Sequence, residues 1–298
     1  MIKISDLNKS YGKNQVLDNL NCNIKTNSIY GLIGANGAGK STLLRIIADV
    51  IRRDSGSVLI DDREVEDSEI VKQKIAFLPD DLYFFSGYTM LDMAKFYEAM
   101  YEKFDMAYFK ELAEMLKLDI NSKVENFSKG MKRQVSLICT IATNADYLLF
   151  DETFDGLDPV IRNLMKKIIA KQMDTKSTTI IMTSHNLREL EDICDNLGLL
   201  YKGGILFESD IDTLKTNMFK VQISLKDDFD KDSFKGLDIL SFSKTGSVAK
   251  IIIKGEREDA EKILQAKDPI ILDFLPLTLE EVFIYEMEVL GYEFNQMV

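Results

Sequence analysis

A glycine-rich segment with one lysine and two hydroxyl residues, residues 34–42, carries the side chains best suited to chemistry. It reads Gly-Ala-Asn-Gly-Ala-Gly-Lys-Ser-Thr and directly follows the apolar run of residues 29–33. Glycines allow backbone N–H groups to close around phosphate oxygens, where a Cβ would obstruct them. A helix that begins after such a loop points its positive end at the same phosphates. The segment therefore predicts a binding loop for a nucleotide triphosphate.

Two side chains of this loop have expected roles beyond binding. Lys40 can reach the β- and γ-phosphates, and the Ser41 hydroxyl can bind Mg²⁺. The strand–loop–helix context that the motif requires is present, which argues against a chance glycine-rich turn. The nucleotide-binding residues that we expect in the loop are Asn36, Gly37, Gly39, Lys40, Ser41 and Thr42.

An acidic pair, Asp151 and Glu152, follows the apolar run of residues 147–150. An acidic residue at the end of a hydrophobic strand, in a chain with a phosphate loop, is the Walker B arrangement. We expect Asp151 to hold Mg²⁺, directly or through water. Glu152 is placed to polarise the attacking water as the general base. The alternative is an acidic pair that merely ends a strand, which the phosphate loop disfavours.

His185 is the only histidine of the chain, and it follows the apolar strand predicted over residues 179–184. A lone histidine is usually structural. This one is expected at the C-terminal edge of the sheet, where ligands bind in open α/β folds. We therefore expect His185 to contact the γ-phosphate or the attacking water.

The elements that position these residues alternate between strands and helices. Continuous apolar runs at 147–150 and 179–182 are typical of parallel strands buried on both faces. Helices are expected at about 160–173 and 187–194, and this alternation predicts a parallel sheet. A helix is expected from Ser41, with an apolar face formed by Leu43, Leu44, Ile47 and Val50.

Two further regions differ in character from this core. Residues 88–120 contain two helical patterns, the better one with Tyr108, Leu112 and Met115 at helical spacing. From about residue 216 the chain reads as a small α+β domain with a helix at 256–266. A last helix begins at Thr278, with Glu281 as its capping-box partner. The apolar stripe of that helix is Leu279, Val282, Phe283 and Leu290.

The predicted fold class is α/β, with a P-loop NTPase core, an antiparallel β subdomain and a helical insert at about 88–135. The predicted domains are residues 1–215 and an accessory α+β domain at 216–298. The 298 residues are 46% hydrophobic, which is enough for a sizeable core, and the net charge of −12 disfavours general nucleic-acid binding. The three cysteines lie far apart without the spacing of a metal site, which fits a reducing cytosol better than a disulfide framework. No stretch approaches the roughly 18 apolar residues of a membrane span, and the N-terminus is no signal peptide.

A third motif, Phe127-Ser128-Lys129-Gly130-Met131, precedes the acidic pair. It resembles the Leu-Ser-Gly-Gly-Gln signature of the ATP-binding cassette (ABC) ATPases, and the resemblance covers roughly residues 1–215. It implies that Tyr11 stacks on adenine and that His185 is the switch histidine. It also implies that Asp155–Asp158 contacts a partner subunit. Asp80 stands where the family has a glutamine ligand of Mg²⁺, and we expect coordination to survive because a carboxylate binds hard cations.

The resemblance also implies a mechanism and partners. Two cassettes, either a homodimer or this chain with a related ATPase, would close head to tail around two ATP molecules. Ser128 and Gly130 of one chain would then contact the ATP that the other chain holds. This motion would drive export through a separate membrane permease, with the chain on the cytoplasmic face of the membrane. Peptides are the favoured cargo, lipids and drugs remain open, and the alternatives are a soluble ABC ATPase acting on ribosomes or DNA and an inactive binding module.

Overall fold

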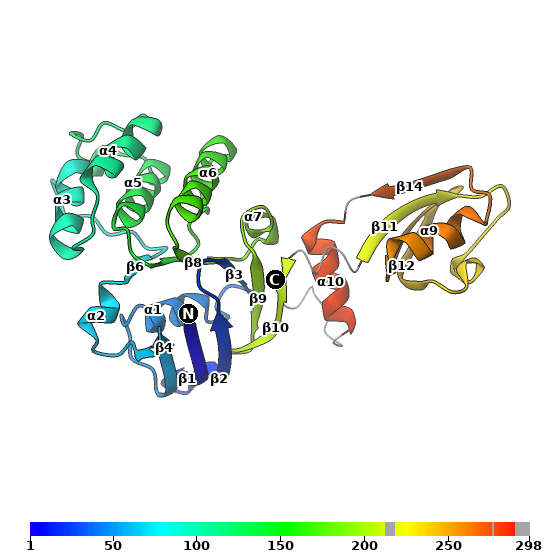
Figure 1. The fold of residues 1–298 in the computed structure, drawn as a ribbon, viewed down its shortest axis with the longest axis horizontal. Coiled ribbons are helices and arrows are strands. Elements are labelled where there is room, and N and C mark those ends of the chain that lie inside the picture. Colours follow the sequence, from blue (N-terminus) through cyan, green and yellow to red (C-terminus); the bar gives the residue numbers. More distant parts are fainter. Residues whose placement is uncertain (212–217, 276, 290–298) are drawn as a thin grey trace. The chain divides into compact units, whose positions relative to one another are not determined.

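The computed structural model describes residues 1–211, 218–275 and 277–289. The chain divides into two compact units, one of Met1–Glu208 and one that begins at Ser209. Figure 1 follows the elements of both units along the chain. The domain boundary predicted after residue 215 lies outside the described residues.

A six-stranded sheet with the order β10-β9-β3-β8-β7-β6 runs through the first unit. Neighbouring strands from β9 to β6 pair in parallel. Strands β3, β7 and β8 are buried along their whole length, as expected of strands covered on both faces. The predicted parallel sheet is therefore confirmed. The strands are β3 (Ile29–Ile33), β6 (Ile75–Leu78), β7 (Tyr147–Phe150), β8 (Thr179–Ser184), β9 (Asn196–Tyr201) and β10 (Gly204–Asp210).

A second sheet, with the order β2-β1-β4-β5, is antiparallel. Its strands are β1 (Ile2–Tyr11), β2 (Asn14–Ile24), β4 (Ser55–Ile60) and β5 (Arg63–Glu64). One hydrophobic cluster joins this sheet, through Ile4 and Val58, to Leu44 of helix α1 (Lys40–Ile47) and to Leu32 of β3. The core of the first unit thus packs the helix after the glycine-rich loop against both sheets.

Helix α1 is shorter than predicted. Leu43, Leu44 and Ile47 are buried on its apolar face, but Val50 lies beyond the helix and is exposed. The cause is Asp49, whose φ of 52° is left-handed and ends the helical path.

The helical insert contains α3 (Met90–Met100), α4 (Met106–Met115), the 3₁₀ turn η1 (Val124–Asn126) and α5 (Lys129–Ala142), after the short α2 (Glu69–Lys72). Figure 1 shows α3, α4 and α5 grouped together. Both helical patterns are confirmed, but the buried face of α4 is Phe109, Leu112 and Ala113, and Met115 is exposed. The i, i+3, i+4 spacing from Phe109 sets this face.

Two further helices connect the parallel strands. Helix α6 (Pro159–Thr175) joins β7 to β8, and α7 (Leu187–Glu191) joins β8 to β9. The side chain of Asp158 caps α6 by accepting hydrogen bonds from the N–H groups of Val160 and Ile161, both at 3.0 Å. Because the strands are parallel, the residues that follow β3, β6, β7 and β8 meet at one edge of the sheet.

The second unit is built on a four-stranded antiparallel sheet with the order β12-β13-β11-β14. Its core combines Val221, Ile251 and Ile253 of the sheet with Leu264 of helix α9 and Phe234. The predicted helix at 256–266 is confirmed as α9. The elements are β11 (Met218–Ser224), η2 (Lys231–Phe234), β12 (Asp238–Thr245), β13 (Val248–Lys254), α9 (Arg257–Gln265), β14 (Ile271–Leu275) and α10 (Leu279–Val289).

The predicted capping box of the last helix is present. The Thr278 N–H donates to Glu281 Oε2 at 3.1 Å, and the Glu281 N–H donates to Thr278 Oγ1 at 3.3 Å. Leu279, Val282 and Phe283 are buried, whereas Leu290 lies outside the described residues.

Cys22, Cys139 and Cys194 are buried and free, and burial raises the pKa of the Cys22 thiol to about 12. Within the described ranges, none of the helices combines the length and the apolar character that a bilayer crossing requires.

Candidate active site

The glycine-rich loop runs from the end of β3 into α1. Gly39 precedes α1 with φ 109°, a conformation that L side chains rarely adopt. A Cβ on Gly39 would also lie 2.9 Å from Leu17 Cδ2 and 3.0 Å from the Val16 carbonyl oxygen. As the N-cap residue, Gly39 has no side chain that could cap the start of α1. The N–H groups of the first turn of α1 are therefore available to an anion, as the predicted binding of phosphate requires.

Lys40, the first residue of α1, is almost fully buried and folds back over the loop. Its ammonium donates to the Gly34 carbonyl oxygen at 2.7 Å and forms an ion pair with Glu152 Oε1 at 3.1 Å. The charge is therefore held at the mouth of the loop, where phosphate oxygens would compete for it.

Glu152 follows Asp151 after the end of β7, and its carboxylate contacts two side chains of the site. Its Oε1 faces Lys40, and its Oε2 lies 2.9 Å from His185 Nδ1. The side chain is 13% exposed. Its backbone φ is 47°, in the left-handed region, which is uncommon for a residue other than glycine and is frequent at functional sites.

Asp151 is fully buried at the end of the same strand. Its Oδ1 accepts a hydrogen bond from Thr183 Oγ1 at 2.7 Å. Within the described part of the chain, Asp151 Oδ2 has no hydrogen-bond partner. A buried carboxylate oxygen without a donor has the character of a cation ligand, because an unpaired buried charge is otherwise costly.

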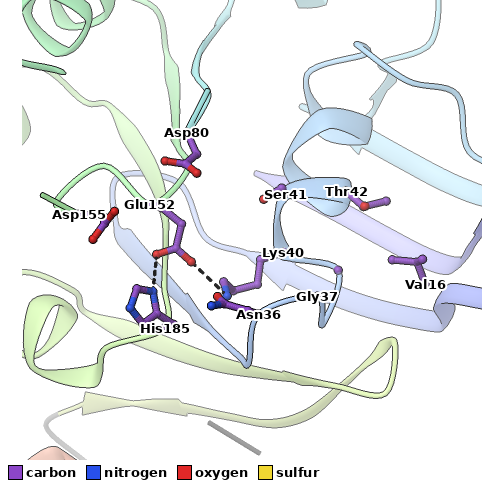
Figure 2. Close-up of a pocket in the computed structure, with 11 residues that line it drawn as sticks. Val16, Asn36, Gly37, Lys40, Ser41, Thr42, Asp80, Glu152, Asp155 and His185 are labelled. Carbon is purple, nitrogen blue, oxygen red and sulfur yellow. Dashed lines mark hydrogen bonds and ion pairs between the residues drawn. The ribbon is translucent and has the colours of Figure 1, made fainter. Parts of the chain in front are cut away.

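A cavity of about 450 Å³ is lined by Lys40, Glu152 and His185, among other residues (Figure 2). Its walls come from the glycine-rich loop and from the residues that follow β6, β7 and β8. In Figure 2, Glu152 reaches between Lys40 and His185, while Ser41 and Thr42 lie on α1. The lining residues are Val16, Asn36, Gly37, Gly39, Lys40, Ser41, Thr42, Asp80, Glu152, Asp155 and His185.

Asp80 lines this cavity but has a partner outside it. Its Oδ1 accepts a hydrogen bond from Arg133 Nη2 of α5 at 2.7 Å. The Arg133 side chain is 2% exposed, and its Nη1 has no hydrogen-bond partner among the described residues. One oxygen of the carboxylate that we expected to bind Mg²⁺ is therefore already engaged by a buried cation.

Four of the expected site residues lie outside the cavity lining: Tyr11, Ser128, Gly130 and Asp151. Tyr11 is exposed at the end of β1, with Lys9 Nζ 5.6 Å from its ring centroid. Ser128 caps α5 by accepting from the Met131 N–H at 3.2 Å. A Cβ on Gly130 would lie 3.9 Å from the Gly156 carbonyl oxygen, so the signature motif borders the segment after Glu152.

Sequence reasoning missed two buried residues of this region, Thr183 and Arg133. Thr183 bonds to both acidic residues after β7, and Arg133 bonds to Asp80. A threonine within an apolar strand is explained by its preference for strands, and an arginine after Lys132 is expected on the surface. Asp155, expected at a partner subunit, also lines the cavity.

The residues expected to bind Mg²⁺ suit that ion chemically. Ser41, Asp80 and Asp151 offer only oxygen atoms, which Mg²⁺ prefers. Among the described residues, no cluster of three or more His, Cys, Asp or Glu side chains could hold a metal by itself.

Comparison with known proteins assigns the family. Residues 17–155 match the family model described as "ABC transporter". The ABC transporter ATP-binding protein YtrB of Bacillus subtilis is 32% identical over 284 residues, covering 95% of this chain and 97% of YtrB. The lantibiotic transport ATP-binding protein SrtF of Streptococcus pyogenes is 32% identical over 213 residues, covering 71% of this chain and 92% of SrtF.

A solved structure of the ATP-binding subunit of an ABC transporter has the same fold. The TM-score is 0.66 at 24% identity, and the match covers 72% of this chain and 92% of that one. The predicted α/β P-loop fold is confirmed. The relatives give no support to the alternative of a soluble factor acting on ribosomes or DNA. The chain belongs to the ATP-binding subunits of ABC transporters, a family of ATPases, and it binds ATP.

Proposed function

We propose that the cavity is the site of ATP hydrolysis and that Glu152 is its general base. The observation that carries this proposal is the Glu152 carboxylate between Lys40 Nζ, at 3.1 Å, and His185 Nδ1, at 2.9 Å. A carboxylate fixed at this point can accept the proton of an attacking water. Lys40 would exchange its contact with Glu152 for the phosphates, and His185 would hold the water or the γ-phosphate.

Mg²⁺ would be held by Ser41 and Asp151, with Asp80 contributing its second oxygen. When bound, Mg²⁺ neutralises charge that develops on the phosphates. The buried Asp151 Oδ2, which lacks a hydrogen-bond donor in the described chain, supports this assignment. The Ser41 side chain, which lines the cavity at the start of α1, supports it as well.

Two cassettes would close head to tail around two ATP molecules, as a homodimer or with a related ATPase. The position of the signature motif supports this arrangement. Ser128 and Lys129 are exposed at the start of α5, and neither they nor Gly130 line the chain's own cavity. Their N–H groups and the Lys129 charge therefore suit the phosphates of another chain.

Replacing the general base tests both the chemistry and the dimer. Glu152→Gln keeps the shape of the side chain but cannot accept a proton, so kcat should fall by about 10²- to 10⁴-fold. Because the ATP then persists, the variant should form dimers with ATP at micromolar protein concentration. Turnover and light scattering on a size-exclusion column measure the two effects.

The same variant with ADP is the control and should remain monomeric. If turnover is lost but ATP leaves the variant monomeric, the base assignment survives and the ATP-bridged dimer does not. Turnover close to that of the wild type would instead remove Glu152 from the reaction.

The membrane partner would dock on the helical insert. Tyr83, Phe85, Tyr88 and Phe96 form an aromatic patch. The ring centroid of Phe85 lies 5.5 Å from that of Tyr83, 4.9 Å from that of Tyr88 and 5.0 Å from that of Phe96. Tyr83 is 75% exposed, and Tyr88 and Phe96 are also exposed. Exposed apolar surface of this kind marks interaction sites. The patch supports docking against a separate permease, and we propose that this takes place on the cytoplasmic face of the membrane.

Peptide export is the transport function that we propose, because the relative SrtF is named for lantibiotic transport. The chain would be co-reconstituted in vesicles with the membrane protein that co-purifies with it. Tyr83→Ser together with Phe96→Ser should lower ATP-driven efflux of a labelled lantibiotic at least about tenfold, because hot-spot aromatics dominate interfaces. ATP hydrolysis by the isolated subunit should not change.

Ile70→Ser, which alters an exposed residue of α2 outside the aromatic patch, is the matched control. Efflux unaffected by the double substitution would contradict the docking surface. ATPase stimulation by the membrane protein without movement of peptide would contradict the cargo.

A further inference from the structure

Thr183 lies between the two acidic residues and the core of the sheet. Strands β7 and β8 pair in parallel with Phe150 opposite Met182. The next residue of each strand path, Asp151 and Thr183, therefore stands at the same level. Thr183 is 3% exposed, so no bulk solvent competes for its hydroxyl.

The single hydroxyl of Thr183 makes two hydrogen bonds, and each goes to a different acidic residue. It donates to Asp151 Oδ1 at 2.7 Å. It accepts from the backbone N–H of Glu152 at 3.0 Å. A threonine hydroxyl has one proton, so donation to the carboxylate directs a lone pair toward the amide. The β-branched side chain also restricts χ1, which fixes the oxygen in place.

For Asp151 the consequence is that its two oxygens are not equivalent. Oδ1 is occupied by Thr183, and Oδ2 is the oxygen without a partner among the described residues. The hydroxyl therefore selects which oxygen is left for a cation and fixes the plane of the carboxylate. Such partners of a metal ligand tune metal affinity without touching the metal.

For Glu152 the consequence concerns the backbone. A φ of 47° is unfavourable for a residue other than glycine and persists only where the surroundings hold the backbone there. The hydrogen bond from the Glu152 N–H to Thr183 is one such restraint. From this conformation the carboxylate reaches both Lys40 and His185.

We propose that Thr183 is a positioning residue for the ATPase reaction, because one buried hydroxyl orients the Mg²⁺ ligand Asp151 and the general base Glu152 together. The inference rests on the roles proposed above for these two residues. It assigns a function to a side chain that does not line the cavity.

Four variants separate positioning from packing. Thr183→Val keeps the branched shape and removes both hydrogen bonds, and Thr183→Ser keeps the hydroxyl. Thr179→Val is the matched control, because Thr179 is 2% exposed at the start of the same strand and its hydroxyl accepts from the Asn27 N–H at 2.9 Å. Thr183→Ala serves if the valine variant does not fold.

Thr183→Val should lower kcat by about 10- to 100-fold, the range found for partners of metal ligands. Its KM for ATP should stay within about threefold, because the glycine-rich loop is intact. A second measurement does not depend on turnover. In the presence of the non-hydrolysable analogue AMP-PNP, the Mg²⁺ concentration that gives half of the rise in Tm should increase about 10-fold. Thr183→Ser should restore most of both properties, and Thr179→Val should match the wild type.

A Thr183→Val protein with the kcat and Mg²⁺ response of Thr179→Val would overturn the inference. If the valine variant does not fold, the same result with Thr183→Ala overturns it. Failure of the underlying site assignment looks different, because Glu152→Gln would then turn over ATP while the Thr183 variants are unaffected or merely unstable.

Discussion

Two carboxylates that line the same cavity are held in opposite ways. Glu152 follows β7, is 13% exposed, and pairs with Lys40 and His185, both of which also line the cavity. Asp80 follows β6, is 54% exposed, and pairs with Arg133 of α5, which is 2% exposed. In the first case the interactions stay within the nucleotide site. In the second case the buried member is a cation of the helical insert.

A position in the cavity lining does not by itself define the role of a carboxylate. Glu152 and Lys40 can separate when phosphates arrive, because each gains a new polar partner there. If Asp80 moved toward a cation, Arg133 would remain buried without its anion, and that is costly. The contacts support the proposal that Glu152 acts in the reaction, and they link Asp80 to the helix that begins with the signature motif.

Of the changes that test this comparison, replacing Lys40, the cation of the Glu152 ion pair, should lower turnover the most. Lys40→Ala should lower turnover by about 10²- to 10³-fold, because it removes the charge that stabilises the transferring phosphoryl group. Binding of a fluorescent ATP analogue should weaken in parallel. Steady-state turnover and fluorescence titration measure the two effects. Lys110→Ala, on the exposed face of α4, is the control, and retained hydrolysis in Lys40→Ala would remove the phosphate-loop assignment.

A smaller effect on turnover, but a larger one on stability, is expected at Asp80. Asp80→Asn should lower the free energy of unfolding by about 1–3 kcal/mol, because Arg133 stays buried with a weaker partner. Turnover should fall by less than about tenfold if the contribution to Mg²⁺ binding is secondary. Urea unfolding and ATPase assays measure both, with the adjacent exposed Asp81→Asn as the control.

A double-mutant cycle with Arg133→Met sharpens this result. The coupling energy should lie within about 0.5–3 kcal/mol, as for residues in direct contact. A coupling energy near zero would show that the Asp80–Arg133 contact does not contribute to stability. A change in Mg²⁺ dependence in Asp80→Asn, but not in Arg133→Met, would identify Asp80 as a ligand in addition.

The sequence predicts the parallel sheet and the convergence of Lys40, Glu152 and His185 because each follows or begins an element with a strong local pattern. The residues after buried parallel strands must meet at one edge, so adjacency there needs no knowledge of side chains. The exposed Met115 and Val50 show the limit of that reasoning. Helical spacing alone does not say which of several apolar stripes is buried or where a left-handed residue ends the helix.

The interactions of Thr183 and Arg133 could not be predicted, for a different reason. The two partners of Thr183 are fixed by the register of β7 against β8, and the partner of Arg133 is fixed by the packing of α5. All three hydrogen bonds join residues that are at least 31 positions apart in the chain. A periodic pattern carries no information about contacts of this kind. The contact of Tyr11 with adenine is expected from the family resemblance alone. Tyr11 is exposed and does not line the cavity.

The left-handed backbone at Glu152 also restricts which residues natural variation can place there. Asparagine, aspartate and glycine accept positive φ most readily, whereas valine, isoleucine and threonine do so poorly. A library of all substitutions at this position would then show two separate effects. Activity would fall where the carboxylate is lost, and stability would fall where the residue does not accept a positive φ. Abundance of each variant inside cells, scored beside its activity, would separate the chemical requirement from the conformational one.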